Sequence, residues 1–497
     1  MTLIVIVLMR IATITAAALT ASLLTALPAA ATPQVPDRYA HQQLGWAPCP
    51  ADKLPGLECA TVTVPLDWNN AGQGKDITLA ISRLKSKNPT PKVLFTNPGG
   101  PGGEGRTLPY AYLKRERLTA THDIYGIDTR GTGASNPMNC GGQATLGWEL
   151  DPRDHSDGNL DLMLDSARLG REYCQVKSGE LGKFVNTEQI VKDYDLIRQV
   201  LGADKINYVG YSGGTWYGAY YATYFPQHTG RFVLDSNTYF TGDWKQSFGG
   251  QPEAFERRFR EDFLPWVAKY DAIYHQGKTA EDARSNYEKL RAGLVAKPLT
   301  PNGKPFGPTD LDGVIVQALY HKQSFTNLAA GLAELNEGKA DKLAAIAAVT
   351  AYPEPMLATL FSVLCNDMPW PGSEDDLIRE SGENGRKYPL IGYTKIVQSC
   401  HGWKRPPVKL KHPDGKGVPP VLMVQSDHDP ATNTALAEKA HREFAGSRML
   451  RITEEGDHGI YALAGNPCAD DIVEQYLIDD KVPAADLSCK GTGLPQP

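Results

Sequence analysis

Basic residues are not in surplus in this chain, which carries 51 Lys and Arg against 57 Asp and Glu. A protein that binds nucleic acid normally has a basic surplus gathered into clusters. The sequence also has no internal repeat and no long low-complexity tract. Its 497 residues are enough for about two to four compact units. We therefore expect a globular protein with no nucleic-acid partner.

Metal-binding spacings are missing as well. The eight cysteines and 11 histidines form no C-x-x-C and no H-x-x-x-H pattern, so a metal site is not indicated. The glycine-rich stretch at residues 99–103 is not followed by the Gly-Lys-Ser/Thr of a phosphate-binding loop. Neither a metal centre nor a nucleotide site is therefore expected.

Charge is almost absent from the first 31 residues, where Arg10 is the single charged side chain. An apolar Ala/Leu/Thr-rich run ends at Pro28 and is followed by three alanines. This pattern predicts a secretory signal peptide, residues 1–31, cleaved after Ala31. An uncleaved membrane anchor is the alternative, since the apolar stretch is long enough to span a bilayer. The helix-breaking Pro28 and the small residues after it favour cleavage.

The cysteines agree with export. Their even number is typical of disulfides formed outside the reducing cytosol. Eight cysteines allow about 105 pairings, of which pairing between sequence neighbours is the simplest. We expect a secreted, extracellular protein without stable membrane association. The four neighbouring pairs are Cys49/Cys59, Cys140/Cys174, Cys365/Cys400 and Cys468/Cys489.

Short apolar runs bounded by turn residues alternate with helical patterns. This alternation is typical of a parallel sheet with crossover helices. Over residues 187–226 the predicted order is helix, strand, tight glycine-rich turn and helix, with Thr187 capping the first helix and Gly202 ending it. The predicted strands cover residues 93–96, 123–128, 206–210, 231–235, 421–425 and 449–453.

The stretch 237–405 differs, because helical patterns dominate it and strand candidates are few. We interpret it as a helical cap inserted into an α/β core. The core would then comprise residues 32–236 and 406–497. The expected fold class is an α/β-hydrolase core with a mostly parallel sheet and this inserted cap.

Ser212 is the central residue of the only G-x-S-x-G sequence, at residues 210–214. It falls between a predicted strand and a predicted helix, which is where a nucleophile elbow lies. Small flanking residues are needed because the backbone turns sharply there. Ser212 is therefore the predicted nucleophile, and an inert serine in a glycine-rich connector is the alternative.

A serine nucleophile needs a base that is oriented by an acid, and in this fold the chain order is Ser, acid, His. Asp429 follows the predicted strand 421–425 and is the predicted acid, with Asp427 as the second choice. His458 is the last histidine of the chain, and glycines lie close on both sides of it. It is the predicted base, with His428 as the main competitor.

The oxyanion of an acyl-transfer reaction needs preorganised N–H donors. One would come from Gly213, directly after the nucleophile. The other would come from Gly100 or a neighbour, in the loop after the strand 93–96. Pro101 has no N–H and cannot serve.

Several motifs together resemble one family. These are residues 97–103 (NPGGPGG), 128–135 (DTRGTGAS) and 210–215 (GYSGGT), followed by Asp-Pro at 429–430 and Gly-Asp-His-Gly at 456–459. They are similar to the secreted tripeptidyl aminopeptidases of actinomycetes, in the proline iminopeptidase-related branch of α/β-hydrolases. The likeness spans Cys49 to Cys489.

This resemblance implies release of short peptides from free N-termini, with Ser212, Asp429 and His458 as the triad and without metal or organic cofactor. Two departures are Glu104, where a small residue is expected, and Thr-Asn at 432–433 in place of Thr-Pro. A peptide ammonium group calls for a carboxylate in a partly closed pocket. Glu104 and Asp367 are the candidates, although either could be an ordinary surface or structural carboxylate.

Two other functions fit parts of this pattern. A secreted esterase or lipase would use the same triad, because the pocket and not the fold decides the substrate. A non-catalytic binding protein of hydrolase fold is the third possibility. It is disfavoured because all three triad positions are occupied.

Overall fold

A computed structural model describes residues 35–397, 400–406 and 408–497. The expected signal peptide, residues 1–31, lies outside this range. Within it, ten strands form a single sheet in the order β1-β2-β3-β5-β4-β6-β7-β8-β9-β10. The strands are β1 (Ala47–Pro48), β2 (Glu58–Pro65), β3 (Asp76–Leu84), β4 (Lys92–Asn97), β5 (His122–Ile127), β6 (Ile206–Tyr211), β7 (Thr229–Asp235), β8 (Leu422–Ser426), β9 (Arg448–Thr453) and β10 (Leu487–Lys490).

The sheet is mostly parallel, as predicted. All pairings from β5 through β4 to β10 are parallel, whereas β1, β2, β3 and β5 pair antiparallel. Each of the six predicted strands is present, shifted by two residues at most. The strands that we did not predict, β2 and β3 among them, lie towards the ends of the sheet, and β2 has partly exposed residues between buried ones.

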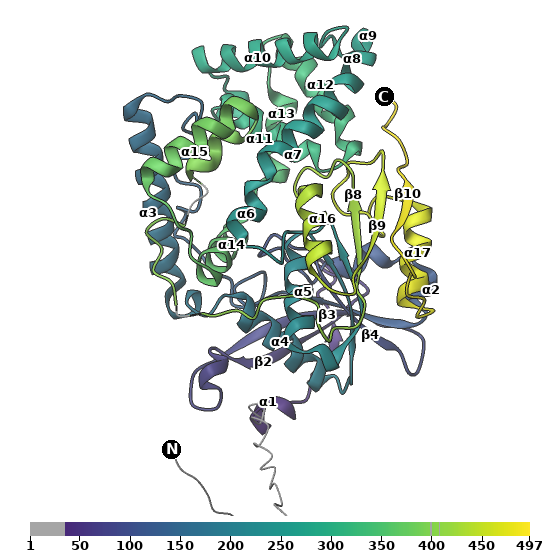
Figure 1. The fold of residues 1–497 in the computed structure, drawn as a ribbon. Coiled ribbons are helices and arrows are strands. Elements are labelled where there is room, and N and C mark those ends of the chain that lie inside the picture. The colour runs from purple at the N-terminus through teal and green to yellow at the C-terminus, as the bar shows by residue number, and fades with distance from the viewer. Residues whose placement is uncertain (1–34, 398–399, 407) are drawn as a thin grey trace, which may run out of the picture. The chain divides into compact units, whose positions relative to one another are not determined.

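Helices flank this sheet (Figure 1). Those outside the segment between β7 and β8 are α1 (Asp37–Ala40), α2 (Glu116–Thr119), α3 (Asp157–Gly182), α4 (Thr187–Val200), α5 (Gly213–Tyr224), α16 (Thr434–Glu443) and α17 (Pro467–Leu477). The predicted helix, strand, turn and helix around Ser212 correspond to α4, β6 and α5.

The cap of α4 differs from the prediction. Asn186, not Thr187, is the N-cap, and its side chain accepts a hydrogen bond from the N–H of Gln189. Thr187 is the first helical residue and donates its N–H and its hydroxyl to the carboxylate of Asp367. A serine or threonine is therefore not needed to cap this helix, because asparagine does so equally well.

Between β7 and β8 the chain forms helices, which lie above the sheet in Figure 1. Those between residues 251 and 350 share an apolar core that includes Phe259, Leu311 and Phe325. The helices are α6 (Trp244–Gly249), α7 (Gln251–Arg257), α8 (Leu264–Lys269), α9 (Asp271–Tyr274), α10 (Ala280–Ala296), α11 (Pro308–Leu319), α12 (Phe325–Asn336), α13 (Asp341–Thr350), α14 (Glu354–Asp367) and α15 (Glu374–Lys387). We call these helices and their connections the cap.

Helix α3 packs against the cap, although it precedes β6 in the chain (Figure 1). Just before α3, Asp151 pairs with Arg291 of α10 at 2.6 Å, and Arg153 pairs with Glu288 at 2.8 Å. Residues 36–497 form one compact unit. The predicted domain boundaries at residues 237 and 405 assign α3 to the core. Its contacts nevertheless join it to the cap.

The four disulfides join the cysteines that are neighbours in sequence, as expected. Within the described residues no single helix is long and apolar enough to cross a membrane. The bent pair α13 and α14, which meet at 58°, passes the same length and composition test together.

Replacing Asn186 by Ala removes the acceptor at the start of α4. We expect the free energy of unfolding to fall by about 1 kcal/mol, measured as an earlier urea midpoint. Gln199→Ala, near the other end of the same helix, is the control and leaves the midpoint unchanged. Equal midpoints for wild type and Asn186→Ala would contradict the cap.

Candidate active site

Ser212 lies on a sharp turn between β6 and α5. Its backbone has φ 54° and ψ −125°, which an L-residue rarely adopts outside such turns. The glycines around it are needed for space, because a Cβ on Gly210 would lie 2.6 Å from the carbonyl oxygen of Gly214. A Cβ on Gly214 would lie 2.7 Å from the carbonyl oxygen of Asn97. The predicted strand, elbow and helix are therefore present.

Asp429 follows β8 and has no exposed surface. Its Oδ1 accepts hydrogen bonds from the N–H groups of Ala431 and Thr432. His458 Nδ1 lies 2.9 Å from Oδ1 and 3.0 Å from Oδ2. Burial by itself would raise the pKa of Asp429, but the charge and hydrogen bond of His458, with those of Thr432 and Ser236, outweigh it and hold the pKa below its usual value. The carboxylate is thus kept ionised beside the imidazole.

The two competing residues of this loop have other partners. Asp427 forms an ion pair with Arg451 at the surface. His428 Nδ1 lies 2.9 Å from Asp262 Oδ1. Of the two carboxylates and two histidines considered from sequence, the structure therefore joins Asp429 with His458.

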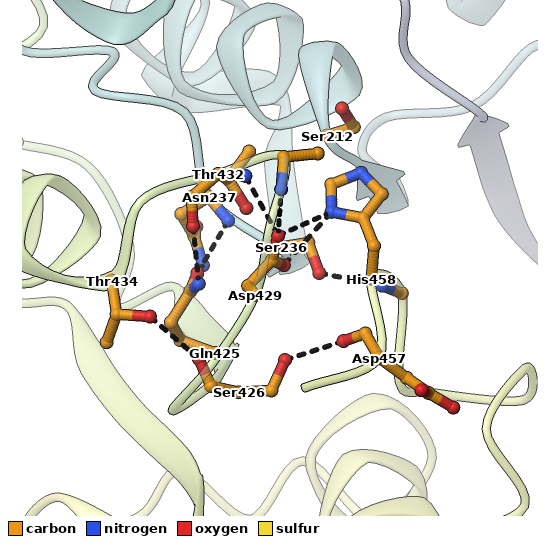
Figure 2. A network of polar contacts seen from close by, with 12 residues as sticks. Ser212, Ser236, Asn237, Gln425, Ser426, Asp429, Thr432, Thr434, Asp457 and His458 are labelled. Carbon is orange, nitrogen blue, oxygen red and sulfur yellow. Dashed lines mark hydrogen bonds and ion pairs between the residues drawn. The ribbon is translucent and has the colours of Figure 1, made fainter. Parts of the chain in front are cut away.

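The loop that carries His458 follows β9 and is held at the end of β7. The N–H of Gly459 donates to Ser236 Oγ at 2.7 Å. The N–H groups of Ile460 and Tyr461 donate to the buried carboxylate of Asp235. In Figure 2 the His458 ring lies between the Asp429 carboxylate and the Ser212 side chain, and Ser236 lies beside the Asp429 carboxylate.

Residues of the cap hold the same loop from the other side. The carbonyl oxygen of Tyr320 accepts the N–H of His458 at 2.9 Å, and the two rings meet edge to face. Asp457 pairs with Arg258 at 2.8 Å and accepts the N–H of Lys322, whose ammonium group pairs with Glu455. The position of the histidine therefore depends on the cap as well as on the sheet.

The glycine-rich loop after β4 packs directly on the serine turn. Gly99 has φ +93°, and a Cβ there would lie 2.4 Å from the carbonyl oxygen of Tyr211. The N–H of Gly99 donates to Asn97 Oδ1. Among the described residues no acceptor binds the N–H of Gly100 or of Gly213, and a Cβ on Gly213 would lie 3.1 Å from the nitrogen of Gly100. Two backbone segments with unpaired donors therefore meet beside Ser212.

A cavity of about 500 Å³ lies against Ser212 and His458. Its wall is formed by the serine and histidine loops, by α3 and the segment before it, and by the cap, with apolar side chains such as Phe255, Leu357 and Trp370. Among the described residues that line it, two have charged side chains of the Asp, Glu, Lys or Arg type, and these are Asp312 and Arg171. The cavity is therefore largely apolar with one group of each charge.

The two carboxylates predicted to bind a peptide amine are elsewhere. Glu104 is exposed to solvent and is not part of the cavity wall. Asp367 is buried behind Trp244, whose indole N–H donates to it, and it also accepts both Thr187 donors. These contacts make Asp367 a structural residue of the layer that supports the cavity wall.

Sequence reasoning did not identify Asp235, Ser236, Tyr320, Asp312 or Arg171. Asp235 could have been identified as a candidate site residue, because it ends a predicted strand at the edge where ligands bind in α/β sheets. The other four are ordinary residues of loops and helices, without a motif around them. The place of Ser236 follows from the contact between the loops after β7 and β9, and the places of the other three follow from the packing of the cap and α3.

The parallel sheet, the strained serine turn and the buried acid–histidine pair define an α/β-hydrolase. The family model described as "alpha/beta hydrolase fold" matches residues 92–279, and "TAP-like protein" matches residues 388–489. The chain is 34% identical to a tripeptidyl aminopeptidase of Streptomyces lividans, over 93% of this chain and 89% of that protein. It belongs to the tripeptidyl aminopeptidase family of serine peptidases.

Two further relatives agree with this family. A tripeptidyl aminopeptidase of Streptomyces coelicolor is also 34% identical, over 93% of this chain and 88% of its own length. The serine protease Hip1 of Mycobacterium tuberculosis is 26% identical, over 91% of this chain and 92% of its own length. The expected enzyme class, a serine hydrolase that acts as a peptidase, is therefore confirmed.

Replacing Gly99 by Ala would push a methyl group into the serine turn. We expect ester turnover to fall by about 100-fold, because small displacements of catalytic groups are this costly. The control is Gly142→Ala, which has a similar φ of +79° but no atom within 4 Å of the new Cβ. Turnover of p-nitrophenyl acetate and thermal unfolding are measured for both. Unchanged turnover in Gly99→Ala would contradict the close packing of the two loops.

Proposed function

We propose that this protein is a secreted serine exopeptidase that releases short peptides, tripeptides in particular, from free N-termini. Ser212 is the nucleophile, His458 the general base and Asp429 the acid that orients it. The observation that carries the proposal is the Asp429–His458 pair, whose imidazole lines the same cavity as Ser212.

The proposed reaction follows from the positions of these three residues. Nε2 of His458, the ring nitrogen that does not bind Asp429, takes the proton of the Ser212 hydroxyl as the oxygen attacks the peptide carbonyl. The imidazolium that forms is stabilised by Asp429 and then protonates the leaving amine. Water, deprotonated by the same histidine, hydrolyses the acyl-enzyme and restores Ser212.

Gly100 and Gly213 are the proposed oxyanion donors. Because the N–H of Gly99 is bound to Asn97, it is not free to serve. The N–H groups of the first turn of a helix have no partner within the helix, which leaves that of Gly213 at the start of α5 available. Both donors belong to rigid, closely packed backbone, as preorganised stabilisation of charge requires.

The free N-terminus requires a partner for its ammonium group, and we assign Asp312 to this role in place of Glu104 and Asp367. It is the one Asp or Glu among the described residues of the cavity wall. Its Oδ1 accepts the hydroxyl of Tyr287 and its Oδ2 the Nε of Arg291. Each carboxylate oxygen has a second lone pair, so the group can accept from an ammonium as well.

Secretion is part of the proposal and rests on the apolar N-terminal segment together with the four disulfides. The length of the released peptide rests on the names of the relatives and on the size of the cavity. A largely apolar cavity of about 500 Å³ suits a short peptide segment better than a folded protein chain.

The first test compares Ala-Ala-Ala p-nitroanilide with its N-acetylated twin. We expect rapid cleavage of the free amine only, and a loss of several orders of magnitude in kcat in Ser212→Ala. Equal cleavage of both substrates would contradict the exopeptidase. Ester turnover without any cleavage of either anilide would favour the alternative, an esterase with the same triad.

A second test removes the charge of Asp312. Asp312→Asn should raise the KM for the free-amine anilide by about tenfold with little change in kcat, because it weakens binding of the ammonium group. Asp151→Asn is the matched control, since Asp151 pairs with the same Arg291 but does not line the cavity. Equal KM values for the two variants would contradict the assignment of Asp312.

A further inference from the structure

Arg171 lies on the buried face of α3, among Leu160, Met163 and Cys174. Positions at this helical spacing are normally apolar. Only 5% of Arg171 is exposed, yet its side chain carries a full charge into the wall of the catalytic cavity. Such a placement costs free energy unless a partner compensates the charge.

Five arginines are buried in the part of the chain that the structure describes, and four of them have a carboxylate partner. Arg130 pairs with Asp193, Arg198 with Asp195, Arg258 with Asp262 and Asp457, and Arg291 with Asp151 and Asp312. Arg171 forms no ion pair with any described residue. It is the exception in a protein that otherwise neutralises its buried guanidinium groups.

The contacts that Arg171 does make leave donors unused. Its Nη2 donates to the carbonyl oxygen of Val397 at 3.0 Å, and the guanidinium stacks on the ring of Phe361 at 3.5 Å. Its Nε is buried and has no acceptor among the described residues. Burial lowers the pKa of Arg171 to about 9, and no neighbouring carboxylate opposes this effect. The group is therefore stacked and oriented but not neutralised.

We propose that Arg171 is a substrate-binding residue that pairs with a carboxylate of the bound peptide. The planar guanidinium, fixed on Phe361, presents donors in the geometry that a carboxylate accepts. The carboxylate is either an Asp or Glu side chain in the released peptide or a terminal carboxylate. With a side chain as the ligand the enzyme selects acidic peptides, and with a terminal carboxylate it selects short peptides with a free C-terminus. Asp312, at another point of the wall, receives the ammonium group. The inference rests on the proposed peptidase function.

The test uses tripeptide anilides of alanine with Glu or Gln at the first, second or third residue. These substrates have no terminal carboxylate, so they report on the side chain alone. We expect Glu to raise kcat/KM over Gln by about tenfold or more at one position, as desolvated ion pairs do. In Arg171→Met this ratio should fall to about one.

The second arm compares trialanine with trialanine amide as inhibitors of p-nitrophenyl acetate turnover. If the terminal carboxylate is the ligand, trialanine inhibits more strongly, and Arg171→Met removes the difference. Tripeptide amides with Glu or Gln are tested in the same assay. Its readout does not need anilide cleavage, so the subsite is tested even if the exopeptidase proposal fails.

The matched control is Arg168→Met, one turn earlier on α3, where the arginine pairs with Asp165 and does not line the cavity. It should keep the wild-type preference. Arg171→Met should unfold at the same temperature as wild type or higher, because it removes an unpaired buried charge. No preference for a carboxylate in wild type, or a preference that survives in Arg171→Met, would overturn the proposal.

Discussion

The buried carboxylate of Asp429 is the group on which the rest of the site depends. A carboxylate without exposed surface is unfavourable unless hydrogen bonds and a positive charge compensate it. Two backbone N–H groups of its own loop and the ring of His458 provide this compensation. The loops after β8 and β9 must therefore meet, and the end of β7 and connecting residues within the cap hold the histidine loop in place.

The cap has two physical roles in this arrangement. It covers much of an apolar cavity at Ser212, whose low polarity strengthens electrostatic interactions beside the serine. It also supplies Tyr320, Lys322 and Arg258, which bind the loop of His458. Substrate enclosure and alignment of the base are thus properties of the same helices, and a displaced cap would disturb both.

Much of the core could be predicted because its signals are local. Strand β6, the glycine-flanked turn at Ser212 and helix α5 each follow from a few adjacent residues, and so do the neighbouring disulfides. The carboxylates of Glu104 and Asp367 show the limit of such reasoning. Both stand beside motifs in the sequence, but one faces solvent and the other binds Thr187 and Trp244, because side-chain direction depends on distant packing.

The sequence by itself determined the class of the protein. The strand–turn–helix pattern and the motifs around the serine, the acid and the histidine each lie in a short contiguous segment, and their order can be read along the chain. Only the tertiary structure decided which aspartate reaches His458 and which charges face the cavity. Asp312 and Arg171 are 141 residues apart in the chain and lie at positions without a motif. Their places in one wall are set by long-range packing, of α3 against α14 and of α11 against the neighbouring cap helices, which no local pattern encodes.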